Sequence, residues 1–166
     1  MNMIKLILNA MILTFFLSCY GQTKVTSEDL KLAIGNWEGS ITYLDYQSNK
    51  TYTMPANLLI KEGNNENTLI LNNNYPNEPK ANNSDKIKIT KNGLLLNKNE
   101  VISKEELKNG GIQIKTEHEA KDDGRKARIR YTYSIGNTIF IIRKEVQFEE
   151  LADWIKRSEF TYTRKK

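Results

Sequence analysis

The strongest constraint on this chain is a succession of ten short segments that have the composition and alternation of β-strands. Most are joined by turns of two to six residues, and no helical segment long enough for a βαβ crossover separates them. The expected strands span residues 37–46, 51–62, 68–72, 86–90, 94–97, 100–107, 112–120, 127–135, 138–148 and 154–164. Short connections of this kind predict an antiparallel meander.

An open meander of this length would leave two edges whose backbone groups have no partner, and closing the sheet removes both edges. We therefore predict an all-β fold, an antiparallel up-and-down β-barrel of eight to ten strands preceded by a short helix. A two-sheet sandwich is the alternative. About 145 residues remain once an N-terminal export signal is set aside, which is enough for one domain with a single core.

Local signals predict the remaining elements. Residues 27–35 should form the helix, with Ser27 as N-cap, acidic residues in the first turn and Gly35 as its end. Residues 98–99 should form a two-residue hairpin turn, and residues 136–137 a tight turn.

One connection is expected to be long. Residues 72–85 contain two prolines and show no periodicity, which predicts a solvated loop of fourteen residues. Only Tyr75 and Pro76 are expected to pack against the domain.

The N-terminus predicts export. Lys5 precedes a twelve-residue apolar run, residues 6–17, which is shorter than the roughly 20 residues needed to span a bilayer. Residues 1–20 are expected to be removed as a signal, residues 21–26 to be a linker, and residues 27–166 to be the single barrel domain. The protein is therefore expected in the cell envelope, or secreted or periplasmic if no anchor is attached.

Cys19 decides between these two locations. The stretch Phe16-Leu17-Ser18-Cys19 resembles the lipobox of bacterial lipoproteins, especially those of Bacteroidetes-type bacteria, and the resemblance implies a lipid on Cys19 and membrane attachment through that lipid. The alternative is cleavage by signal peptidase I, which would release a soluble chain beginning at Gln22. Cys19 is the only cysteine, so no intramolecular disulfide can form.

Charge and composition argue against several functions. The formal charge of +5 is modest, and in residues 125–130 the basic side chains alternate with apolar ones, as in a strand with one wet face rather than a nucleic-acid site. With one His and one Cys, no metal or cofactor site is expected. His118 is expected to be a structural or surface histidine, and no nucleophile elbow surrounds any serine, so we expect no catalytic residue.

Gly35-Asn36-Trp37, which follows the expected helix and begins the first strand, is similar to the G-x-W motif of the lipocalin and fatty-acid-binding (calycin) superfamily. The resemblance implies a barrel plugged at one end by Trp37, packed against an arginine near the end of the last strand. Arg157 and Arg164 could both serve. Ten strands exceed the eight of true lipocalins, so the resemblance implies no ligand-binding residues for this chain.

The penultimate strand, residues 138–148, suggests where a ligand is held. It is apolar on both faces over its first half, which predicts burial on both sides. If the face of Ile139 looks inward, Arg143 is an interior cation able to hold a carboxylate ligand; otherwise Arg143 forms an ion pair with a neighbouring Glu. Tyr131 and Tyr133 would line the cavity.

We therefore expect an exported lipocalin-like protein that binds a small, partly apolar molecule in its barrel. The alternative is an envelope interaction module whose barrel is filled by its own side chains, since 8 Tyr and 5 Phe residues are available to fill it. A hydrolytic enzyme is a third and less favoured function.

Overall fold

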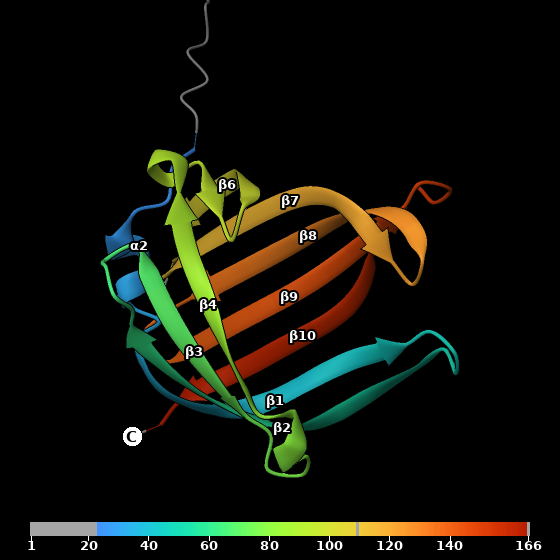
Figure 1. Cartoon of the computed structure of the whole chain (residues 1–166), viewed down its shortest axis with the longest axis horizontal. Helices are drawn as coiled ribbons and strands as arrows, with labels where there is room; N and C mark the ends of the chain where they lie inside the picture. The colour runs from blue at the N-terminus through green and yellow to red at the C-terminus, as the bar shows by residue number, and fades with distance from the viewer. Residues whose placement is uncertain (1–22, 109, 166) are drawn as a thin grey trace, which may run out of the picture.

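The computed structural model describes residues 23–108 and 110–165 of the chain. Ten antiparallel strands close into a barrel in the order β1-β10-β9-β8-β7-β6-β5-β4-β3-β2 (Figure 1). The predicted barrel is confirmed, and the sandwich alternative is wrong. The strands are β1 (Gly35–Asp45), β2 (Lys50–Glu62), β3 (Thr68–Asn74), β4 (Asn83–Thr90), β5 (Leu95–Leu96), β6 (Asn99–Glu106), β7 (Ile112–Asp122), β8 (Arg125–Ile135), β9 (Ile139–Phe148) and β10 (Ile155–Arg164).

One short α-helix, α2 (Ser27–Lys31), lies within the described residues, together with the 3₁₀ turns η1 (Pro79–Ala81) and η2 (Lys91–Gly93). The helix begins one residue earlier than predicted, because Thr26 rather than Ser27 is its N-cap. Both the backbone N–H and the hydroxyl of Thr26 donate to the Asp29 carboxylate, at 2.7 and 3.0 Å. In the part of the chain described, no helix has the length and apolar character needed to cross a membrane.

Two predicted connections differ in detail. The β5–β6 turn is formed by Asn97 and Lys98, both with positive φ (51° and 69°), so the predicted turn at residues 98–99 is one residue too late. Positive φ at both central residues is the geometry of a tight two-residue hairpin. The long loop is shorter than predicted, because β3 continues to Asn74 and β4 begins at Asn83. The side chain of Tyr75 packs against the core.

The alternation of side chains defines the inside of the barrel. On β9, Phe140 is fully buried whereas Ile139 is 45% exposed, so even-numbered residues of this strand point inward. The predicted burial of β9 on both faces is therefore wrong. Its register with β8 places Tyr133 opposite Ile142 and Tyr131 opposite Lys144, and these four side chains share the inner face.

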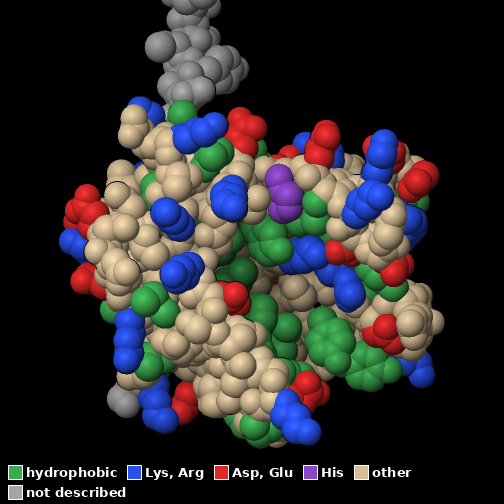
Figure 2. All heavy atoms as spheres, in the orientation of Figure 1, with side chains coloured by type: hydrophobic (Ala, Val, Ile, Leu, Met, Phe, Trp, Pro, Cys, Tyr) green, Lys and Arg blue, Asp and Glu red, His purple; other side chains and the backbone are tan. Residues whose placement is uncertain are grey.

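The barrel wall is incomplete between β4 and β7. β5 pairs with β4 only at Ile89 and Thr90, and pairing between β6 and β7 stops at Glu100 opposite Glu117. Within the described residues, the stretches 83–87 and 118–122 therefore have a strand partner on one side only. Figure 1 shows the separation between β4 and β7, and Figure 2 shows a hollow on this face with hydrophobic and basic side chains inside it.

Candidate functional site

Trp37, the residue predicted to plug the barrel, is buried near the start of β1. The side chain is 1% exposed, and its indole N–H donates to the carbonyl oxygen of Ala33, in the turn after α2, at 2.7 Å. The ring packs against Phe140, with 5.7 Å between the ring centroids. A buried tryptophan with its only polar atom paired is a stable closure for this end of the core.

Arg164 covers the outer side of Trp37. Its guanidinium carbon lies 4.2 Å from the centre of the indole ring. The same side chain donates to three carbonyl oxygens, those of Leu32 at 2.5 Å, Ile34 at 2.8 Å and Asn137 at 2.6 Å. Arg164 therefore links the turn after α2 to the β8–β9 turn.

Gly35 is required by this arrangement. Its φ of +135° is unfavourable for other residues, and a Cβ at this position would lie 2.6 Å from Nη1 of Arg164. Arg157, the other arginine considered for the plug, lies elsewhere: its guanidinium carbon is 4.2 Å from the centre of the Tyr46 ring. The contacts of the plug thus involve Gly35, Trp37 and Arg164.

Beyond the plug, the interior contains a cavity of about 290 Å³. This volume lies at the lower end of the roughly 300–1,000 Å³ typical of small-molecule sites. The lining residues are Leu71, Asn73, Tyr75, Asp85, Lys86, Ile87, Asn97, Asn99, Tyr131, Tyr133, Ile142, Phe160 and Tyr162. Because residues of β4 and of the β5–β6 turn form one wall, the cavity borders the incomplete part of the barrel.

Aromatic rings form the opposite wall of the cavity. Tyr131 stacks on Tyr133 with 6.2 Å between centroids, and Phe160 stacks on Tyr162 with 5.7 Å. Burial raises the pKa of Tyr133 and Tyr162 well above the usual value, so both hydroxyls stay protonated. The surface they offer is apolar and flat, with hydroxyl groups that can donate or accept hydrogen bonds.

Arg143 does not point into this cavity. It lies on the outer face of β9, opposite Glu159 of β10, and its Nε donates to the Glu159 carboxylate at 2.5 Å. The prediction of Arg143 as an interior cation is wrong, because the Phe140 face of β9, not the Ile139 face, is the inner one. The ion pair with a neighbouring Glu is the arrangement found.

Lys144, the next residue along β9, faces the interior instead. Its side chain is 22% exposed, and its Nζ lies 2.5 Å from Oδ1 of Asp122. Tyr46 donates its O–H to Oδ2 of Asp122 at 2.9 Å, and Nε of Arg157 lies 3.7 Å from the same oxygen. Lys144, Arg157, Asp122 and Tyr46 form a charged cluster. None of the four lines the cavity, and the cluster adjoins it through Lys144, which is opposite the lining residue Tyr131 on the inner face.

The cluster keeps Asp122 ionised. Burial alone would raise the pKa of Asp122, but hydrogen bonds from Lys144 and Tyr46, with the charges of Lys144 and Arg157, outweigh it and hold the pKa below 3.8. Burial, reinforced by the hydrogen bond to Asp122, raises the pKa of Tyr46 to about 12. At neutral pH the cluster therefore contains two cations and one anion.

His118 is the inward-facing neighbour of this cluster on β7. Its ring is stacked in parallel with Tyr131, with 6.3 Å between centroids, and its Nδ1 has no hydrogen-bond partner. Burial, followed by the positive charge of Lys144, lowers the pKa of His118 below 6.5. The ring is therefore neutral at neutral pH and adds a polar atom next to the aromatic wall.

This lowered pKa predicts how stability depends on pH. The unfolded chain binds a proton at His118 more readily than the folded chain does, so stability should fall as the pH drops from about 6.5 toward the folded pKa. Asp122 and Glu159 have pKa values below 3.8 and 4.5, so their contributions are lost only at lower pH. Thermal unfolding between pH 7.5 and 5.5 should show a falling Tm for the wild type and a flatter profile for His118→Gln. Equal slopes would contradict this assignment.

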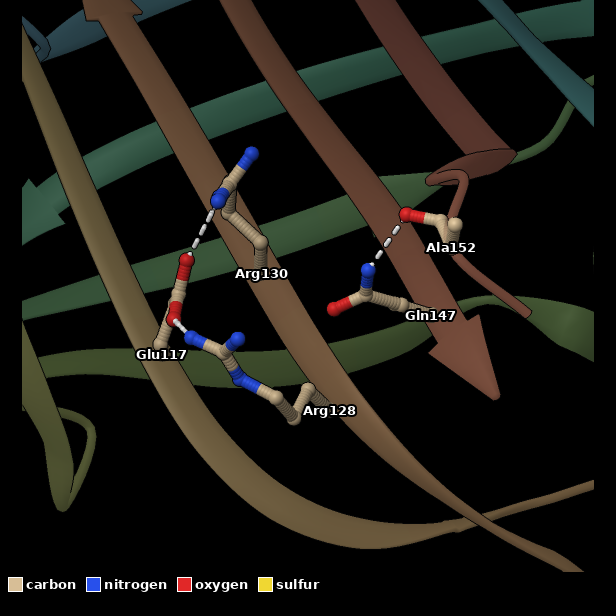
Figure 3. A network of polar contacts seen from close by, with 5 residues as sticks. All are labelled: Glu117, Arg128, Arg130, Gln147 and Ala152. Carbon is tan, nitrogen blue, oxygen red and sulfur yellow. Dashed lines mark hydrogen bonds and ion pairs between the residues drawn. The ribbon is translucent and has the colours of Figure 1, made fainter. Parts of the chain in front are cut away.

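The outer face of β7 and β8 carries a second group of charges. Glu117 contacts both Arg128 and Arg130, and Gln147 donates to the carbonyl oxygen of Ala152 at 2.6 Å (Figure 3). The predicted alternation of this strand is confirmed, because the arginines face outward and Ile129 is buried. Arg130 also covers the ring of Trp154, with its guanidinium carbon 3.9 Å from the ring centre.

A hollow of about 570 Å³ lies beside these residues, and it is larger than the interior cavity. Half of its lining residues are charged, and the rest include Ala120, Ala127, Phe148 and Leu151. Lys126 and Glu149 of this lining form an exposed ion pair, and Arg128 pairs with Glu117 outside it. Exposed paired charges of this kind are ordinary on a strand face. We therefore take the interior cavity, with its aromatic wall and the neighbouring partly exposed cations Lys144 and Arg157, as the candidate site.

The fold and this cavity define a closed antiparallel β-barrel with an interior pocket. No protein-family model matches the chain, and no curated protein compared with it matches either. Among solved structures, the chain is similar to a protein of unknown function from the DUF3598 family of Nostoc punctiforme PCC 73102. The identity is 9% and the TM-score 0.40, over 86% of this chain and 50% of that chain, so this chain spans half the length of its neighbour.

Proposed function

We propose that this protein binds one small amphipathic molecule inside its barrel, in the manner of a lipocalin-like binding protein rather than an enzyme. The observation that carries the proposal is the cavity of about 290 Å³, which has an aromatic wall and borders the incomplete part of the barrel. The apolar part of the ligand packs against Tyr131, Tyr133 and Phe160. Its anionic group reaches toward Lys144 and Arg157.

The alternative is a barrel filled by its own side chains. The large aromatic residues gather mainly at the plug and along one wall, and they leave the space between that wall and β3–β4 open. This distribution favours a binding protein. The envelope location, and the lipid on Cys19 that would attach the protein to a membrane, remain proposals based on residues 1–22, which lie outside the described part of the chain.

The cavity can be tested with N-phenyl-1-naphthylamine, a neutral apolar probe that fluoresces when it leaves water. The wild type should bind it saturably at one site. Ile142 lines the cavity, whereas Ile141 lies on the opposite face of the same strand. Filling the cavity by Ile142→Trp should weaken binding by roughly tenfold or more, about 1.4 kcal/mol per tenfold.

Ile141→Trp is the matched control, because it adds the same ring to the outer face and should leave the affinity unchanged within about twofold. Both variants are excited at the absorption band of the probe, so that the new tryptophan does not enter the signal. A wild type without saturable binding, or equal effects of the two variants, would support the filled barrel.

A further inference from the structure

We infer that Asp122 acts as an internal counter-anion in the binding site, and that it restricts the site to ligands with a single negative charge. The inference rests on the proposed function, because it concerns the selectivity of the same cavity. It assigns Asp122, which contacts both interior cations, as a residue that determines specificity.

The two cations are bound to Asp122 unequally. Lys144 lies 2.5 Å from Oδ1, which is a short charged hydrogen bond. Arg157 lies 3.7 Å from Oδ2, too far for a hydrogen bond. Within the described residues, Arg157 donates no hydrogen bond at all; its other contact is the face of the Tyr46 ring. Its planar fork of donors is therefore available to a ligand.

The position of Arg157 explains this arrangement. The pairing of β9 and β10 shifts between Lys156 and Ser158, so Arg157 is the extra residue of a β-bulge. Bulges turn a side chain away from the direction that regular alternation would give it. Here the bulge brings a side chain only 28% exposed next to Asp122. A partly exposed guanidinium that donates no hydrogen bond to an anion can gain charged hydrogen bonds from a ligand that supplies one.

Asp122 lies where the chain can adjust to a ligand. It is the last residue of β7, in the stretch 118–122 that has a strand partner only in β8. The turn that follows contains Asp123 and Gly124, both with positive φ. Strand ends with few partners open more easily than the interior of a sheet. Lys144 can therefore leave Asp122 and bind an incoming anion, while Tyr46 still donates its hydrogen bond to Asp122.

The charge balance sets the preferred ligand. Lys144 and Arg157 carry two positive charges and Asp122 one negative charge. Two further pairs of charges offset each other. One is Arg125, over the Phe148 ring, with Asp45, bound to Ser48 in its own turn. The other is Asp85 with Lys86, which both line the cavity. His118 is neutral. The site thus has an excess of one positive charge, which one monoanion neutralises, whereas a dianion would leave an unpaired negative charge at a partly buried position.

Two ligands with the same apolar body test the inference on the wild type. At pH 8, 1-naphthyl sulfate carries one charge and 1-naphthyl phosphate carries two, because the second phosphate pKa is about 6. Each is used to displace N-phenyl-1-naphthylamine. The wild type should bind the sulfate roughly tenfold more tightly than the phosphate. An equal or reversed preference would overturn the inference.

Asp122→Asn should reverse the preference, because it leaves two cations unopposed, and Asp122→Glu should keep the wild-type order. The affinity for N-phenyl-1-naphthylamine shows in each variant that the cavity is intact. An Asp122→Asn protein that binds this probe normally but still prefers the sulfate would also overturn the inference. If the wild type binds no probe, the proposed function itself fails; if it binds the probe without charge preference, only the role of Asp122 fails.

Discussion

Replacing Trp37 by Ala should lower the free energy of unfolding by about 3–5 kcal/mol, the usual range for emptying a large buried aromatic site. The side chain is 1% exposed and contacts Phe140, Arg164 and the Ala33 carbonyl oxygen, so its removal leaves a cavity and an unpaired acceptor. Chemical denaturation measures this change directly. The loss should appear as a lower midpoint with an unchanged slope.

The second tryptophan of the chain is a matched control. Trp154 is half-buried on the outer face, where Arg130 covers its ring at 3.9 Å and Arg128 lies 5.7 Å from the ring centre. Trp154→Ala should cost roughly 1–2 kcal/mol, as expected for two cation–π contacts at an exposed site. If the two tryptophan variants had similar stability, Trp37 would not be the closure of the barrel.

The strands could be predicted because their evidence is local. Alternation with period two, turn residues and short connections are properties of neighbouring residues, and they identified all ten strands to within a few residues. Closure of the sheet into a barrel could be predicted because exposed sheet edges leave backbone groups without partners. The limits of the β3–β4 loop could not be predicted in the same way. Asn73 and Asn74 extend β3 because they pair with Asn83 of β4 and Asn57 of β2, far along the chain.

The prediction of which face of β9 points inward is wrong. The first half of β9 is apolar on both faces, so Ile139 and Phe140 do not indicate which face points into the barrel. The second half does contain a signal: Val146 and Phe148 follow Lys144 on one face, whereas the alternate residues are polar. The alternation over the whole strand, unlike that of its first half, indicates that Lys144 lies inside and Arg143 outside.

The rest of the charged cluster could not be predicted from the sequence. Tyr46 and Asp122 are 76 residues apart and meet because the ends of β1 and β7 lie at the same end of the barrel. Arg157 joins them through a β-bulge, and β10 contains no glycine or proline that would predict a bulge. Such contacts depend on the register of several strands at once, and that register is fixed only in the closed barrel.

If the barrel holds an amphipathic anion against Lys144, the two adjacent basic residues of β9, Arg143 and Lys144, should affect binding differently. Lys144 faces the interior, whereas Arg143 faces outward and pairs with Glu159. The probe is 8-anilino-1-naphthalenesulfonate, which shares its aromatic body with N-phenyl-1-naphthylamine but carries one sulfonate. Lys144→Gln removes a charged hydrogen-bond donor from the site and leaves Asp122 to repel the sulfonate. A charged hydrogen bond is worth about 1.5–3 kcal/mol.

The measurement is a fluorescence titration of the two variants with both probes. Lys144→Gln should weaken binding of the sulfonate by roughly 10- to 100-fold and leave the neutral probe unchanged within about twofold. Arg143→Gln removes the same formal charge from the outer face of the same strand and should leave both affinities unchanged. Equal losses in the two variants, or sulfonate binding that is insensitive to Lys144→Gln, would contradict an interior anion site.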